Sequence, residues 1–409
     1  MRTAYIAAVV FAIVYIALDL NKLYALRYGA DLGTYLQTLV NLRHGSSWNF
    51  GEWKPHFHVH DSWILLLFVP LVAIAPYAQT LIAVQVIAVA AAIIPLVAFA
   101  REIGVTPRAA NLLGIAYLMT PSAQGVAYDN FSENVFVPLL AFSGALFARK
   151  RLLWPTLAVA LLLAVTKEDE VLFVLWFGAA CALWWDRRIG LSVLAVALAA
   201  GAAFWLSERL SGGHPNVPPY GFAVNDPGGK LTMVALLLAP FAFAPLAIGS
   251  ALLLGLPLAA EIVFMRPWNY EPSRVGSHYT APLLAVTAVA AGFGLRRWPN
   301  LARALIPCAL IVMLLFSDGV LHLGRWPYIV DWAAYGRAVA LRDSGATAIV
   351  PRFDEGTWAV AAANPRIGLN PSPAPPRALC PAYDTNARAF FESVIGRMPA
   401  RLCRGVPIR

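Results

Sequence analysis

Apolar runs of membrane-spanning length recur along most of this chain, and they limit its fold more than any other feature. A run of ~20 apolar residues crosses the hydrocarbon core of a bilayer. Hydrophobic residues make up 59% of the 409 positions and charged residues only 13%, which a soluble core could not accommodate. The sequence therefore predicts an all-α polytopic protein of the plasma (inner) membrane. Dividing the chain by such windows predicts about eleven spanning helices, near residues 4–21, 78–100, 108–122, 133–148, 152–166, 170–186, 189–207, 230–247, 248–264, 279–295 and 301–317.

Basic residues predict the orientation, because Lys and Arg collect in the short cytoplasmic loops. With about eleven spans, the basic clusters all fall on the side of the N-terminus: Arg2, Arg101, Arg108, 149–151, 187–188 and 296–297. We therefore expect a cytoplasmic N-terminus. The first run lacks a small-residue cleavage site and reads as a retained helix. The net charge of +9 first reflects these loops, so nucleic acid is not an expected partner.

The apolar run 61–76, "DSWILLLFVPLVAIAP", is the exception to this scheme. If it crossed the membrane, every later loop would change sides and the arginine clusters would lie outside. A short run interrupted by proline can instead be re-entrant or lie along the interface. We expect it to lie outside without spanning. Segments 22–60, 123–132, 208–229 and 265–278, the stretch "KEDE" at 167–170 and everything after about Ser317 then share the outer side.

Ionisable groups gather in these outer segments, and such groups at a membrane are a functional-site hypothesis. Asp31 opens an amphipathic stretch, residues 28–45, either as a helix N-cap or as a functional carboxylate. His56, His58 and His60 alternate, so in an extended strand they would share one face. A solvated His-rich loop and an anion site are the alternatives to a metal site.

Two further acidic segments and a cationic one follow. Asp129 and Glu133 are four residues apart, as on one helical face, and either acid could also cap the next helix. Lys167 precedes three acids, more than one cap requires. The segment 265–282 offers the groups that hold phosphate, although an interfacial belt of aromatic residues and arginine explains part of it: Arg266, Arg274, His278 and Tyr279.

The order of several motifs carries a family resemblance over most of residues 1–320. They are "ADLGTYLQTLVNLRHG", "HDSWILLLFVP", the glutamine of "TLIAVQVIA", the acids of "YDNFSEN", "TKEDEVLF" and "SHYTAPLL". The chain resembles a prokaryotic family of multipass membrane proteins known only as a domain of unknown function. That family looks like a distant branch of the GT-C glycosyltransferases, which use polyprenyl-phosphate sugar donors at the outer membrane face and place juxtamembrane helices in the first outer loop.

The resemblance implies roles for matching positions. Asp31 stands where GT-C enzymes have a catalytic acid, and Asp129 with Glu133 stands where they have a second acidic motif. The family usually has Asp-Phe-His-Pro-Glu there, whereas this chain has "DNFSE" and lacks the His and Pro.

The remaining implied roles concern substrate binding. His60 matches a family histidine, and Lys167, Glu168 and Asp169 match a Lys-Glu-Asp triplet. Lys167 would face a lipid phosphate, and an acid would face the sugar or a divalent cation; the residues leave a metal requirement open.

Beyond about residue 320 the composition changes to more charge and proline. We expect a transmembrane domain, 1–320, and a small extracytoplasmic α/β domain, 321–409, with a helix, the short strand "ATAIV" and a second helix-like stretch, followed by "RIGLN", before a proline-rich connector. Cys380 and Cys403 lie in this tail, and we expect them to form a disulfide worth roughly 3 kcal/mol in the chain-entropy model. Cys181 and Cys308 lie in apolar spans and should be free thiols.

Function therefore has three candidate classes. The first is a transferase that moves sugar from a polyprenyl-phosphate donor, with the donor and membrane lipids as partners. The second is a transporter or flippase for a lipid-linked or anionic substrate, which would want polar residues near the midplane. The third is a catalytically silent scaffold on the same fold. The sugar, the acceptor and the oligomeric state do not follow from the sequence.

Overall fold

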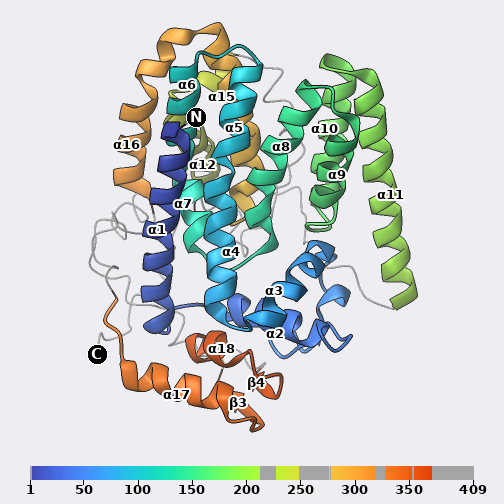
Figure 1. Ribbon diagram of the computed structural model, residues 1–409, viewed down its shortest axis with the longest axis vertical. Coiled ribbons are helices and arrows are strands. Elements are labelled where there is room, and N and C mark those ends of the chain that lie inside the picture. The colour runs from blue at the N-terminus through green and yellow to red at the C-terminus, as the bar shows by residue number, and fades with distance from the viewer. Residues whose placement is uncertain are drawn as a thin grey trace.

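The computed structural model describes residues 2–211, 227–247, 276, 278–317, 328–351 and 354–370. Helices dominate this part of the chain, and most of them run along the long axis of the molecule (Figure 1). The axial helices are α1 (Arg2–Tyr24), α4 (Ala78–Ala91), α5 (Ile93–Glu102), α6 (Pro107–Leu118), α7 (Pro121–Tyr128), α8 (Val137–Arg149), α9 (Leu153–Ala164), α10 (Glu170–Trp184), α11 (Arg187–Ser211), α12 (Pro227–Leu238), α15 (Ala281–Arg297) and α16 (Leu305–Phe316). Short 3₁₀ turns join several of them: η3 (Glu133–Phe136), η4 (Ala239–Phe241), η5 (Ala244–Ala247), η6 (His278–Thr280) and η7 (Pro299–Arg303).

The basic clusters lie at one end of this bundle. α1 starts there, α5, α8 and α15 end there, and α6, α9, α11 and α16 begin there (Figure 1). Contacts join the clusters, since Arg151 Nε lies 3.8 Å from Asp186 Oδ2 and Arg149 stacks over the Trp185 ring. The grouping of arginines expected from the positive-inside rule is therefore present in the fold.

Four helices are long and apolar enough to cross a bilayer: Arg2–Tyr24, Ala78–Glu102, Arg187–Leu210 and His278–Arg297. Others within the described residues are shorter apolar helices, such as Leu153–Ala164 and Glu170–Trp184. At 1.5 Å per residue a helix of 12 residues reaches only ~18 Å, well short of the ~30 Å core. The chain is thus a multipass membrane protein, and the count of eleven spans stays a prediction.

Proline explains part of the shortening. The predicted span 108–122 divides near Met119, because Pro121 begins the separate helix α7. Pro138 likewise stands in the first turn of α8, so the first residues of the predicted span 133–148 form a 3₁₀ turn instead. Proline cannot donate the backbone hydrogen bond that would continue the preceding helix. The predicted span 248–264 lies outside the described residues.

The opposite end of the bundle carries the first polar loop (Figure 1). Its helix α2 (Ala30–Leu42) buries most of its length, and a small hairpin of β1 (Trp48–Asn49) and β2 (Lys54–Pro55) follows. The run 61–76 forms η2 (Trp63–Phe68) and α3 (Val69–Ile74), which are too short to span. Several of its apolar side chains are exposed, as an interfacial segment requires: Leu66, Leu67, Leu71 and Ile74.

The segment after residue 331 forms the expected helix, strand and second helix, and then a further short strand that was not predicted from the sequence. These elements are α17 (Trp332–Asp343), β3 (Ala348–Val350), α18 (Glu355–Ala361) and β4 (Ile367–Leu369), with β3 and β4 paired in parallel. α18 packs against α2 at the polar end of the bundle (Figure 1). The division at residue 320 stays a prediction, and the expected Cys380–Cys403 disulfide lies outside the described residues. Cys181 and Cys308 are free, as expected.

Close packing of α10 on α11 depends on small residues, as in many membrane helix pairs. A Cβ on Gly190 would lie 2.1 Å from the backbone nitrogen of Ala182, which is a severe overlap with main chain. The same addition at Gly201 would meet Val171 Cγ1 at 3.5 Å, an ordinary contact.

We expect Gly190→Ala to separate α10 from α11 and to cost about 1–3 kcal/mol, the range for overpacking. Gly201→Ala, on the same helix, should be neutral or slightly stabilising because alanine favours helix. Thermal unfolding in detergent, monitored through the reactivity of the buried Cys181 thiol, measures the effect of both substitutions. Equal midpoints for the two variants would contradict the packing argument.

Candidate functional site

Lys167 and Glu133 form a buried ion pair at the polar end of the bundle. Lys167 Nζ lies 3.6 Å from Glu133 Oε1, and both side chains are almost fully buried. Tyr35 of α2 donates a hydrogen bond to the other oxygen, Glu133 Oε2. Lys167 also stands 4.9 Å above the ring of Tyr279. Burial alone would lower the pKa of Lys167, but the charges of Glu133 and the neighbouring acids raise it well above its ordinary value. The lysine is therefore a fixed positive charge.

A second pair joins His60 to Glu168. His60 Nδ1 lies 3.2 Å from Glu168 Oε1, and the backbone N–H of Asp61 donates to Glu168 Oε2 over 3.2 Å. Burial alone would lower the pKa of His60, but the hydrogen bond to Glu168 outweighs it and raises that pKa above 6.5. Burial would raise the pKa of Glu168, yet His60 and Lys167 together lower it. The first polar loop is thus tied to the loop between α9 and α10.

A third pair joins His278 to Asp129. His278 Nδ1 lies 3.3 Å from Asp129 Oδ2. Gln85 fixes this loop from within the membrane helix α4, because its side-chain amide donates to the carbonyl oxygens of Val126, Ala127 and Asp129. The glutamine of "TLIAVQVIA" thereby has a physical role in holding the second acidic motif.

Asp31 lies in the first turn of α2 with its side chain exposed. It stands four residues before Tyr35, one helical turn along α2 from the donor to Glu133. The structure brings together His60, Asp129, Glu133, Lys167, Glu168, His278 and Tyr279, all of which the sequence singled out. Asp169 is next to Glu168 and within electrostatic reach of Lys167. Arg266 and Arg274 lie outside the described residues.

Several local expectations were wrong. Asp129 ends α7 with an extended backbone and Glu133 begins η3, so the two acids do not share a helical face. Asp31 is not an N-cap, because Gly29 holds that position in α2. Neither Asp129 nor Glu133 caps the next helix: Ser132 caps η3, accepting from the N–H of Asn134.

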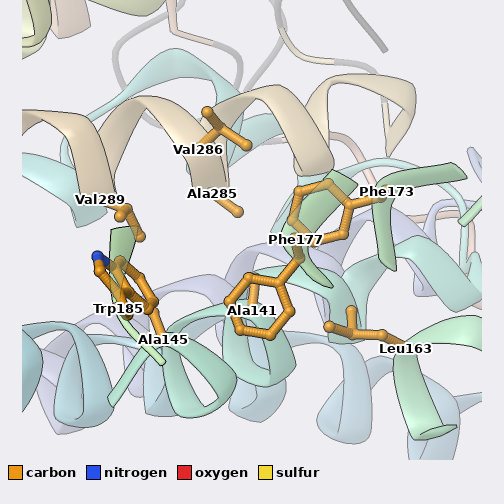
Figure 2. A pocket seen from close by; sticks show the side chains of 9 residues that line it. All are labelled: Ala141, Ala145, Leu163, Phe173, Phe177, Trp185, Ala285, Val286 and Val289. Carbon is orange, nitrogen blue, oxygen red and sulfur yellow. The ribbon is translucent and has the colours of Figure 1, made fainter. Parts of the chain in front are cut away.

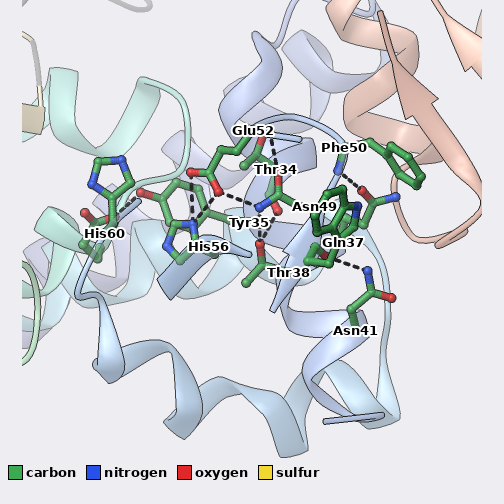
Figure 3. A network of polar contacts seen from close by, with 12 residues as sticks. Thr34, Tyr35, Gln37, Thr38, Asn41, Asn49, Phe50, Glu52, His56 and His60 are labelled. Carbon is green, nitrogen blue, oxygen red and sulfur yellow. Dashed lines mark hydrogen bonds and ion pairs between the residues drawn. The ribbon is translucent and has the colours of Figure 1, made fainter. Parts of the chain in front are cut away.

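The three alternate histidines do not form a strand. Residues His56–His58 make a 3₁₀ turn, η1, so His56 and His60 approach each other, with ring centroids 5.5 Å apart, while His58 is exposed. His56 is fully buried, its Nδ1 lies 3.1 Å from both carboxylate oxygens of Glu52, and its ring meets that of Tyr35 (Figure 3). A solvated His-rich loop is thus excluded for His56.

Sequence reasoning missed this Glu52–His56 pair, and it missed two polar groups inside α1. Asp19 is fully buried and accepts a hydrogen bond of 2.7 Å from the hydroxyl of Tyr28. Lys22 donates to the carbonyl oxygen of Tyr128 over 2.6 Å and lies between the rings of Tyr28 and Tyr128. The sequence did contain a signal for these two residues. Both lie near the end of the first apolar run, where the cost of burying a charge requires a partner.

An apolar cavity lies between helices that neighbour the ion pairs in sequence. It is lined by side chains of α8, α9, α10 and α15 and by Trp185, which follows α10 (Figure 2). Leu163 and Phe173 flank Lys167 in sequence, Ala141 follows Glu133, and Ala285 follows His278. The lining residues therefore begin in the helical turns next to the charged groups and extend to Trp185 at the basic end of the bundle. Among the described residues, no group of three or more His, Cys, Asp or Glu side chains is arranged to hold a metal ion.

The His60–Glu168 pair makes stability depend on pH. The raised pKa of His60 gives stability that is complete below 6.5 and is lost as the pH rises through the folded-state value. The lowered pKa of Glu168 gives stability that is complete above 4.5 and is lost as the pH falls through its folded-state value. His60→Gln should therefore reduce the unfolding midpoint most between pH 4.5 and pH 6.5, where both contributions are complete.

His58→Gln is the matched control for this experiment, because the exposed imidazole of His58 has no such partner among the described residues. Its unfolding midpoint should follow that of the unmodified chain at every pH. A His60→Gln profile that also coincides with the unmodified one would show that the pair does not stabilise the fold.

Comparison with known proteins agrees with the membrane architecture. No curated protein matches the chain. A family model described as "Predicted membrane protein (DUF2079)" matches residues 22–207. This segment contains Asp31, His60, Asp129 and Glu133, and Lys167 with Glu168. It also contains the helices from α2 to α10. Residues 22–207 are thus similar to DUF2079, a family of predicted membrane proteins.

Proposed function

We propose that this protein transfers a sugar from a polyprenyl-phosphate donor to an acceptor at the outer face of the membrane, on a GT-C-like fold. One observation carries the proposal: the turns and loops that hold the charged groups lead directly into α8, α9, α10 and α15, the helices that line an apolar cavity. A ligand that fits has a charged head and a hydrocarbon tail. A lipid-linked phosphate sugar has this division, and the tail would remain within the bilayer.

The residues present suit the chemistry of glycosyl transfer. A carboxylate accepts the proton of the acceptor hydroxyl, whose oxygen attacks the anomeric carbon. The bond between that carbon and the phosphate oxygen breaks, and polyprenyl phosphate leaves with the electron pair. Lys167 and protonated His60 or His278 would offset the charge on the departing phosphate. Asp31 is the candidate base, because it stands where the GT-C enzymes have a catalytic acid and its side chain is exposed to an approaching acceptor.

The charge distribution supports the outer location. The basic clusters lie at one end of the bundle and the acid–base pairs at the other. By the positive-inside rule the basic end faces the cytoplasm, so the N-terminus is inside and the site, with residues 332–370, is outside.

Asp31→Asn tests the base. Asparagine keeps the shape of the side chain but cannot accept the proton, so transfer should be abolished while folding and donor binding persist. The measurement follows label from a polyprenyl-phosphate hexose in membranes that contain the unmodified chain or the variant. Normal transfer by the variant would remove Asp31 from the mechanism.

Lys167→Ala tests the phosphate contact and should weaken binding of polyprenyl phosphate in a lipid titration. The single change also leaves Glu133 as a buried charge without its lysine, which destabilises by ~3–5 kcal/mol. The double variant Lys167→Ala/Glu133→Gln neutralises both partners and is the control for folding. A double variant that folds and binds polyprenyl phosphate with unchanged affinity would refute the assignment.

Transport of a lipid-linked or anionic substrate is the second candidate. Asp19 and Lys22 favour it, because buried charges on a membrane helix often mark a transport path, although both lie in the last turns of α1 rather than near the midplane. Proteoliposomes separate the two functions. Movement of a fluorescent polyprenyl phosphate between leaflets without chemical transfer would favour the transporter.

A further inference from the structure

α18 is attached to the first turn of α2, about 325 residues away in sequence. The backbone N–H of Ala30 donates to Glu355 Oε2 over 3.2 Å, and the indole N–H of Trp358 donates to the carbonyl oxygen of Ala30 over 3.1 Å. Trp358 is fully buried. The first residue of α2 is thus held at both its N–H and its C=O by one short helix.

Glycine permits this close approach on both helices. A Cβ on Gly33 would lie 2.4 Å from Trp358 Nε1, and a Cβ on Gly356 would lie 2.0 Å from the carbonyl oxygen of Leu26. Side chains at either position would push α18 away from α2 and from the turn before it.

The attachment continues along α2 into the strand β4. The amide of Gln37 donates to the carbonyl oxygen of Ile367 over 3.0 Å, and the indole of Trp53 donates to that of Leu369 over 2.8 Å. Gln37 also accepts from the N–H of Phe50, which ties the hairpin to the same face (Figure 3). Ala30, Gly33 and Gln37 are spaced three and four residues apart, so they form one face of the helix.

The other face of α2 belongs to the candidate site. Asp31 and Tyr35 are four residues apart on it, and Tyr35 donates to Glu133, the partner of Lys167. The N–H of Gly29, at the start of the helix, donates to Asn130 Oδ1 over 2.8 Å. Any shift of α2 along or about its axis would therefore move Asp31 and Tyr35 relative to Lys167.

We infer that α18 is a positioning element for the site, and that Trp358, seated on Gly33, sets the place of Asp31 and Tyr35 relative to the Lys167–Glu133 pair. This inference rests on the proposed transfer reaction. Trp358 touches α2 rather than the charged groups, so it acts through the helix. In the proposed reaction Lys167, on the loop between α9 and α10, would hold the donor phosphate, whereas the hydrogen bonds of α18 described above go to α2.

Gly33→Ala is the sharpest test, because the added methyl group meets a rigid buried ring. Transfer should fall by roughly tenfold to hundredfold, the effect of a displacement near 1 Å, while the KM for the polyprenyl-phosphate donor stays constant. Amide exchange should quicken in residues 30–36 and 355–361 and remain unchanged in the long helix Ala78–Glu102. Gly336→Ala, on α17 with open space around it, is the matched control and should change neither transfer nor exchange.

Trp358→Phe provides a second variant in case Gly33→Ala does not fold. It keeps an aromatic ring but removes the N–H that Ala30 accepts, so it should give the same pattern in weaker form. Unchanged exchange in residues 30–36, or normal transfer despite faster exchange there, would overturn the inference. A fall in turnover with an equal rise in the donor KM would do the same, because that result indicates general damage to the site. Absence of transfer by the unmodified chain would instead reject the proposed function.

Discussion

The buried Lys167–Glu133 pair is the constraint on which the polar end of this protein depends. Removing two charges from water costs several kcal/mol for each ion, and their attraction offsets this only with good geometry and further hydrogen bonds. The fold supplies both, through the Tyr35 hydroxyl and the Tyr279 ring. Those partners come from α2 and η6, far apart in sequence. Stabilising one ion pair therefore fixes the first polar loop, the acidic motif of η3 and the start of α15 against one another.

The charged end and the apolar cavity also belong together. Each of α8, α9, α10 and α15 contributes apolar side chains to the cavity and has an ionisable group next to its end at the polar side of the bundle. Small residues such as Ala141, Ala145 and Ala285 leave the space, and Phe173, Phe177 and Trp185 form its walls (Figure 2). A membrane protein can retain such polar groups only where they face protein or a ligand. The arrangement accordingly suits an amphiphile better than a small soluble molecule.

Much of the candidate site could be found from the sequence, because a charge beside an apolar run has few tolerable environments. Lys167, Glu168, Asp129 and Glu133 were recognised on that ground. The sequence did not reveal which acid pairs with which base. Helical spacing suggested that Asp129 and Glu133 share a face, whereas the turn at 129–132 directs Asp129 to His278 and Glu133 to Lys167. His56 was misjudged for a related reason. Alternation suggested a strand, but Pro55 and the hairpin before it lead into a 3₁₀ turn, and Glu52 then buries the imidazole.

The sequence by itself determined the multipass architecture, the gathering of arginine at one end and of acids at the other, and the helix, strand and helix that follow residue 331, because hydrophobic length, charge and local periodicity are properties of neighbouring residues. Only the tertiary structure decided how far each helix extends past its prolines, which acid meets which base, and that Trp358 sits on Gly33. Such contacts join residues hundreds of positions apart, and they depend on helix geometry and packing that no single stretch of sequence contains. The position of Asp31 in the site is of this kind, since α18 and the loop of Asn130 hold its helix from two sides.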